Sequence, residues 1–202
     1  KKLRATMDLY FSPKVSAYVL ANPGSMEARS AEVTLLLTDL RNSTPLAEQL
    51  GPGGMFKLLN QVFEVETNAV MGHDGSLEHF LGDQFLTYWG APQPQPDGAN
   101  QALAAAMELI HGMESVKAAQ APNVKALFGY GVALHRGSVL FGNKGSAKRL
   151  DFGLVVLVFG SYVPHAFIHK APKRISCPYS VRAAALSRAE SNHDRERALT
   201  LC

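Results

Sequence analysis

The sequence predicts an α+β domain in which helices lie on one face of a largely antiparallel sheet. The apolar run at residues 32–40 has the length and character of a strand buried on both faces. Residues 52–71 repeat apolar side chains at helical spacing. Two short strand-like segments, 76–81 and 85–89, flank a tight turn and predict an antiparallel hairpin. Because helices and strands follow one another without regular βαβ alternation, an α+β arrangement is favoured over a parallel sheet.

The remaining elements follow from turn residues and periodicity. We expect helices at 3–21 (broken at Pro13), 46–50 and 99–119, strands at 124–134, 138–142 and 150–159, a turn at 135–137, and loops at 25–31, 90–98 and 143–149. The pattern weakens beyond residue 159, although 180–189 is helix-like and indicates extra C-terminal elements. We therefore divide the chain into a helical lead-in, residues 1–30, and one domain, residues 31–202, in which 153–174 is atypical.

Composition narrows the function classes. The chain has 202 residues, of which 47% are hydrophobic, and can bury a core of its own. A formal charge of +3 without a dense Lys/Arg stripe argues against a nucleic-acid partner. Two cysteines do not make a disulfide framework, and no apolar window is long enough to predict a membrane span. We expect a cytoplasmic domain, either free or belonging to a membrane-bound parent protein, with regulatory domains elsewhere in that protein.

Two acidic residues lie at the ends of predicted strands, where they could bind a metal ion. Asp39 ends the first strand, and Asp83 lies in the hairpin turn. If the hairpin pairs beside that strand, both carboxylates reach the same edge, where they suit Mg²⁺ or Mn²⁺. Backbone N–H groups of residues 40–44, at a helix start, could then bind a phosphate. The alternative, which spacing alone favours, is that Asp39 caps a turn and Asp83 is an ordinary hairpin residue.

Several ordered motifs resemble one known family. They are EVTLLLTDLRNST at 32–44, LEHFLGD at 77–83, GVALHRG at 131–137 and FGNKGS at 141–146. Together they resemble the catalytic domain of class III nucleotidyl (adenylate and guanylate) cyclases of bacterial type, over roughly residues 8–153. The resemblance implies a ferredoxin-like βαββαβ-type fold. It also implies that residues 31–202 are the cyclase domain.

The resemblance further implies an activity in signal transduction. Such domains pair head to tail and convert ATP or GTP to a 3′,5′-cyclic nucleotide and pyrophosphate, with two Mg²⁺ or Mn²⁺ ions per site. The 3′-hydroxyl attacks the α-phosphate. The implied catalytic and metal-binding residues are Asp39, Asp83 and the backbone carbonyl of Leu40. The implied substrate-binding residues are Arg41, Asn42, Ser43 and Thr44 in the turn, His79 and Gly153 at the base, and Lys148 and Arg149 at the triphosphate. The partner is a second copy or a complementary cyclase domain.

The sequence also departs from the family. The family's ribose-orienting Asn and transition-state Arg fall on Gly160 and Pro164, which offer no side-chain donor. The stretch is either a sequence or frame error, a true loss, or the mark of a chain that supplies only the metal half to an unlike partner. The alternative function is therefore a catalytically impaired cyclase-homology module used for dimerisation or nucleotide sensing. His79 and Gly153 match neither base pattern of the family, so ATP and GTP both stay open.

Overall fold

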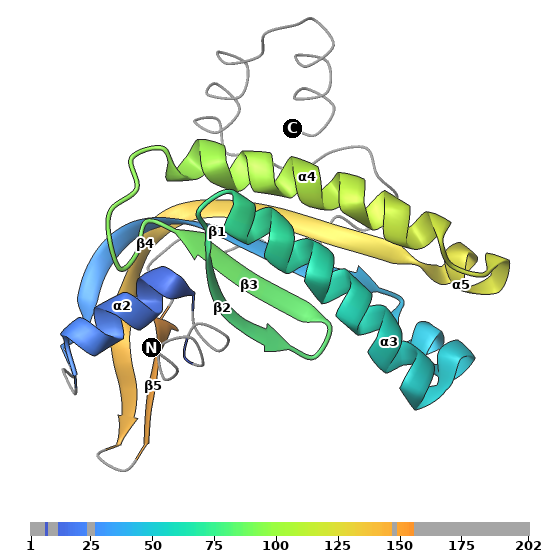
Figure 1. The fold of residues 1–202 in the computed structure, drawn as a ribbon, viewed down its shortest axis with the longest axis horizontal. Helices are drawn as coiled ribbons and strands as arrows, with labels where there is room; N and C mark the ends of the chain where they lie inside the picture. Colours follow the sequence, from blue (N-terminus) through green and yellow to red (C-terminus); the bar gives the residue numbers. More distant parts are fainter. Residues whose placement is uncertain (1–6, 8–11, 24–26, 147–148, 156–202) are drawn as a thin grey trace, which may run out of the picture.

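The computed structural model describes residue 7 and residues 12–23, 27–146 and 149–155 (Figure 1). In chain order the elements are α2 (Pro13–Ala21), β1 (Arg29–Arg41), α3 (Ser43–Gly72), β2 (Ser76–Leu81), β3 (Gln84–Trp89), α4 (Gly98–Ala118), α5 (Pro122–Leu127), β4 (Gly129–Ser146) and β5 (Arg149–Val155). The strands form one sheet in the order β2-β3-β1-β4-β5, and each neighbouring pair is antiparallel. The predicted α+β class and antiparallel sheet are confirmed.

The two faces of the sheet are covered differently. The helices α3 and α4 run side by side on one face, which we call the helix-covered face (Figure 1). The main core lies beneath them and includes Leu36 and Leu40 of β1. On the opposite face, which we call the outer face, α2 packs on Val33 and Leu35 in a smaller apolar cluster. Successive strand residues point to opposite faces, so β1 serves both clusters.

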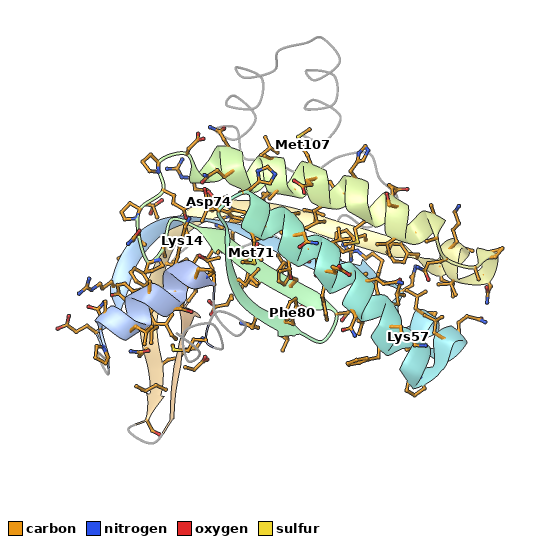
Figure 2. The ribbon with its side chains drawn as sticks, in the orientation of Figure 1. Lys14, Lys57, Met71, Asp74, Phe80 and Met107 are labelled. Carbon is orange, nitrogen blue, oxygen red and sulfur yellow. The ribbon has the colours of Figure 1, made fainter. Side chains whose placement is uncertain are left out.

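Local sequence explains the helix boundaries. The Ser12 hydroxyl accepts a hydrogen bond from the Val15 N–H, and Pro13 occupies the first turn of α2. Helix α3 contains a kink at Gly51, which has a φ of 65° that glycine adopts without strain. Pro52 follows it and starts the second segment of the helix. This kink is the predicted break between the helices at 46–50 and 52–71. An ion pair of 3.5 Å between Lys14 Nζ and Asp74 Oδ1 ties α2 to the turn after α3 (Figure 2).

Four expectations for the loops and strands were wrong. Residues 122–127 form α5 instead of opening a strand at 124, because Pro122 starts a helical turn that buries Val124. The turn expected at 135–137 is absent, because Gly137 takes a ladder position opposite Val33 and β4 continues through it. The loop expected at 143–149 is largely strand, since β4 runs to Ser146 and pairs with β5. The loop expected at 25–31 ends early, with β1 starting at Arg29.

Several expectations lie outside the described residues. These are the part of the first helix before residue 12, the end of the strand at 156–159, the helix at 180–189, and the positions of Lys148, Gly160 and Pro164. Among the residues that the structure describes, no helix combines the length and the apolar character needed to cross a bilayer.

Candidate active site

The sheet register brings the two predicted acids together. Asp39 of β1 pairs with Gln84 of β3, and Asp83 directly precedes Gln84 in the β2–β3 turn. Burial raises the pKa of Asp39, the nearby Arg41 guanidinium lowers it, and the Asp83 carboxylate raises it again. The two carboxylates are thus close enough to interact. Spacing alone left this point open.

Space around Asp39 is provided by a glycine. Gly131 of β4 lies opposite Asp39, and a Cβ at this position would collide with Asp39 Oδ1. Arg41 Nε lies 3.1 Å from the same oxygen. On the same outer face Leu37 is 38% exposed, so α2 does not cover this end of β1. Asp39 therefore lies at an accessible end of the outer face, with a cation and a second acid beside it.

The turn after β1 delivers a helix start to the same place. Asn42 adopts a left-handed conformation with a φ of 59°, and α3 begins at Ser43. The Asn42 side chain does not cap the helix but donates a hydrogen bond of 2.9 Å to the Leu127 carbonyl. Its amide is thus used to fix α5 to the turn. The first-turn N–H groups, including those of Ser43 and Thr44, lie where an anion can be bound.

In β2, where the sequence predicted His79 at the base, the side chains of Glu78 and His79 differ in burial. A bulge between Leu77 and His79 shifts the β2 register. As a result the Glu78 side chain is only 4% exposed, while that of His79 is 50% exposed. Glu78 Oε1 accepts a hydrogen bond of 2.8 Å from the Leu154 N–H, and Lys144 Nζ lies 3.6 Å away.

Glu78 also contacts Gly153, the other residue that the sequence predicted at the base. A Cβ on Gly153 would collide with Glu78 Oε1, so the two are in direct contact. Burial raises the pKa of Glu78, while the Leu154 N–H and the Lys144 ammonium lower it. Glu78 belongs to edge strand β2, whereas its partners belong to β4 and to the opposite edge strand β5, so this contact joins the two ends of the sheet. The sequence predicted His79 and Gly153 at the base; the structure places Gly153 against Glu78, the neighbour of His79, and adds Lys144, which the sequence reasoning did not name.

Not every predicted residue can be placed. Lys148 lies outside the described residues, and Arg149 is placed only as the first residue of β5. A further acid was missed as a functional candidate: Glu66 lies within the apolar stripe of α3 and is fully buried. A charged residue at core spacing in a helix was the signal that could have singled it out.

The polar atoms around Asp39 form a donor set that can be compared with the ligands a hard cation prefers. No cluster of three His, Cys, Asp or Glu side chains that could hold a metal occurs in the described part of the chain. Two carboxylates and a backbone carbonyl are nevertheless all oxygen donors, and Mg²⁺ commonly takes its other ligands from water and substrate phosphates. Burial and, to a smaller extent, the Asp83 carboxylate raise the pKa of Asp39, and a bound cation would oppose both effects. The residues present therefore fit Mg²⁺ or Mn²⁺.

Comparison with known proteins gives one consistent family. The family model described as the adenylate and guanylate cyclase catalytic domain matches residues 26–161, so the match ends inside the atypical stretch at 153–174. Adenylate cyclase 1 of Rhizobium meliloti (strain 1021) is 27% identical over 129 residues, which are 64% of this chain and 19% of that protein. An uncharacterised protein of Mycobacterium tuberculosis is 28% identical over 155 residues, covering 77% of this chain and 27% of that protein. The chain thus spans about a fifth to a quarter of these relatives.

Solved structures agree on the fold. The guanylyl cyclase Cya2 is 31% identical, with a TM-score of 0.58 over 65% of this chain and 66% of that chain. A bacterial light-regulated adenylyl cyclase has a TM-score of 0.65 at 21% identity, covering 77% of this chain and 45% of that chain. The second likeness concerns the fold alone.

Proposed function

Because the chain belongs to the family of adenylate and guanylate cyclase catalytic domains, we propose that it forms a 3′,5′-cyclic nucleotide and pyrophosphate from a nucleoside triphosphate, in signal transduction. The observation that carries this proposal is the meeting of Asp39 and Asp83 at the accessible end of the outer face. Membership of the family comes from the match over residues 26–161.

The roles of the site residues follow from their chemistry. The carboxylates of Asp39 and Asp83 and the carbonyl of Leu40 would hold two Mg²⁺ or Mn²⁺ ions. When bound, such ions neutralise phosphate charge and favour ionisation of an attacking hydroxyl. Arg41 Nε lies 3.1 Å from Asp39 Oδ1, and its guanidinium is a group that would bind a phosphate oxygen. The N–H groups of Ser43 and Thr44 would receive phosphate oxygens at the start of α3.

Dimerisation is part of the proposal. The chain exposes apolar side chains near Asp39 and Asp83, with Leu37 38% and Leu81 64% exposed. Phe80, next to Leu81 on β2, is also 45% exposed (Figure 2). A second cyclase domain, identical or complementary, would cover such surface and supply the other half of the site. Lys148 and Arg149 stay candidates for binding the triphosphate, on the resemblance alone.

The base site supports GTP ahead of ATP. Guanine presents N1–H and N2–H₂ donors on its pairing edge, and a carboxylate accepts from both. Glu78 supplies the carboxylate and Lys144 a donor for the guanine O6. Adenine presents only its amino group as a donor there. The identity of 31% to a guanylyl cyclase points in the same direction.

A second candidate function rests on Gly160 and Pro164, which stand where the family has Asn and Arg. It is a cyclase-homology module that binds a nucleotide or a partner but turns over poorly. Losing a charge-stabilising Arg commonly costs phosphoryl-transfer enzymes orders of magnitude in rate. A heterodimer with a domain that carries Asn and Arg would avoid this loss.

One assay tests both candidates. Protein of confirmed mass is incubated with Mn²⁺ and either GTP or ATP, alone and with a cyclase domain that has Asn and Arg but lacks both aspartates. Cyclic nucleotide is measured by mass spectrometry. We expect slow, Mn²⁺-dependent product from the chain alone and faster formation with the partner. The Asp39→Asn/Asp83→Asn variant should lose at least about a thousandfold in rate, about 4 kcal/mol, because it removes the anionic metal ligands.

The controls separate the outcomes. Thr87→Val removes a buried hydroxyl of β3 away from the site and should leave the rate unchanged. No product under either condition, with retained nucleotide binding, would favour the homology module. Equal rates for the wild type and the double Asn variant would remove the metal role of the aspartates.

A further inference from the structure

A buried polar cluster joins α3 to the two central strands behind Asp39. Glu66 of α3 is 0% exposed, and Thr38 of β1 is 1% exposed. The hydroxyls of Thr38 and Tyr130 both donate hydrogen bonds to Glu66 Oε1, each with an oxygen–oxygen distance of 2.5 Å. Glu66 Oε2 is buried without a hydrogen-bond partner among the residues that the structure places. One carboxyl oxygen thus connects a helix and two strands.

Stability alone does not explain this cluster. Its surroundings are apolar, with Leu36, Leu40 and Val132 in the same core. Burying a carboxyl group costs free energy unless its atoms are hydrogen-bonded, and one oxygen of Glu66 is not. Apolar side chains of similar shape often replace buried polar groups at no loss of stability. A polar cluster instead fixes the relative position of the elements that carry it, because hydrogen bonds depend on geometry.

The position of the cluster along the strands is specific. Thr38 directly precedes Asp39 in β1, and Tyr130 directly precedes Gly131 in β4. Asp39 is the register partner of Gly131, and Leu40 is that of Tyr130. Because strand side chains alternate between faces, Thr38 lies on the helix-covered face while Asp39 lies on the outer face. Glu66 therefore holds the backbone on both sides of the Asp39–Gly131 pair without itself reaching the outer face.

We propose that Glu66 is a positioning residue, which holds the backbone of β1 and β4 so that the Asp39 carboxylate and the Leu40 carbonyl stay directed at the cation. This inference rests on the proposed function. Thr38 and Tyr130 carry the effect from α3 to the two strands. A shift of β1 against β4 by a fraction of an ångström would move both groups of the cation site together. Sites of this kind lose much of their affinity when the residues that orient the ligands are removed.

The test compares three variants by Mn²⁺ binding, measured as free Mn²⁺ by electron paramagnetic resonance with Mn²⁺ alone as the probe. Glu66→Gln keeps the accepting oxygen and should bind Mn²⁺ within twofold of wild type. Glu66→Met removes the acceptor, and Thr38→Val/Glu66→Met/Tyr130→Phe makes the cluster fully apolar. We expect both to bind at least fivefold more weakly, because outer-shell partners of metal ligands commonly contribute a factor of about 10–100 in affinity.

Thermal unfolding separates positioning from folding. The triple variant leaves no hydroxyl without an acceptor, so its unfolding temperature should equal or exceed that of wild type. Thr87→Val, which removes another buried hydroxyl on the same face, should leave Mn²⁺ binding unchanged. Wild-type Mn²⁺ affinity in a folded triple variant would overturn the inference while leaving the proposed function standing. Equal binding by wild type and Asp39→Asn/Asp83→Asn would overturn both.

Discussion

The acidic side chains on the two faces of the sheet have different kinds of partner. On the outer face Asp39 pairs with Arg41 at 3.1 Å, and Glu78 pairs with Lys144 at 3.6 Å. On the helix-covered face Glu66 accepts hydrogen bonds from two neutral hydroxyls, and the described residues place no cation beside it. An acid with a cationic partner retains its charge and can exchange that partner for a ligand. An acid in an apolar core with only neutral donors has a raised pKa, because burial disfavours its charged form.

Under the proposed function, this difference separates the acids that would contact a ligand from the acid that would support them. Asp39 is partly exposed, pairs with the Arg41 guanidinium and has a second acid nearby. Together these features suit an exchangeable cation. Glu78 combines a charge with a backbone N–H that fixes its carboxylate, which suits recognition of a base edge. Glu66 is fully buried and has no counter-ion within the described part of the chain, so any effect on the site must pass through the strands that it joins.

The largest effect that can break this comparison is the pH dependence of stability. Burial raises the pKa of Glu66 to about 7, although the bonds from Thr38 and Tyr130 lower it. The folded chain then binds a proton that the unfolded chain releases near an ordinary glutamate pKa. Stability should therefore fall as pH rises through this window, by about 3 kcal/mol in total.

The measurement is urea unfolding of the wild type and Glu66→Gln between pH 4.5 and 8. The stability difference between the two proteins should change by about 3 kcal/mol across the window, with wild type losing relative to Gln as pH rises. Using the difference cancels the titration of other groups. Parallel curves for the two proteins would mean that Glu66 is charged in the folded chain, and the contrast between the faces would fail.

The main elements were predictable because their signals are local. The apolar run at 33–37 identifies β1 as a central strand, and Gly82 before Asp83 identifies the hairpin turn. From these two elements the meeting of the acids follows if the hairpin pairs beside β1, which it does. The meeting of Asp39 and Asp83 could therefore be predicted from the sequence.

The rest depended on contacts between distant segments. The bulge at Glu78 leaves no mark in the sequence, yet it decides which of two neighbours faces Gly153. Gly137 was expected to turn the chain but is held straight by its pairing with β1. Glu66 occupies an apolar stripe, and its two hydroxyl partners come from elements that are 28 and 64 residues away. Tertiary contacts of this kind override local preference.

A smaller effect concerns the closeness of Glu78 to β5. Gly153→Ala should destabilise the chain by about 2 kcal/mol, because the added methyl group meets the fixed carboxylate of Glu78 and Lys144 Nζ. Gly53→Ala is the matched control, since no atom of the described residues lies within 4 Å of the methyl group that it adds in α3. The control should gain about 0.5–1 kcal/mol from its lower chain entropy. A Gly153→Ala variant as stable as this control would show that Glu78 is not held against β5.

The smallest expected effect concerns whether Glu78 or its neighbour His79 contacts the base. Glu78→Gln keeps the acceptor for the Leu154 N–H but removes the charge, so the fold should persist. We expect GTP affinity to fall about tenfold and ATP affinity to change less than twofold, because one charged hydrogen bond is worth about 1.4 kcal/mol or more. Calorimetric titration with each nucleotide measures this without requiring turnover. His79→Gln is the matched control on an exposed neighbour and should change neither affinity by more than twofold. If His79→Gln weakens nucleotide binding and Glu78→Gln does not, the base is read from the exposed position, and Glu78 joins Glu66 as a purely supporting acid.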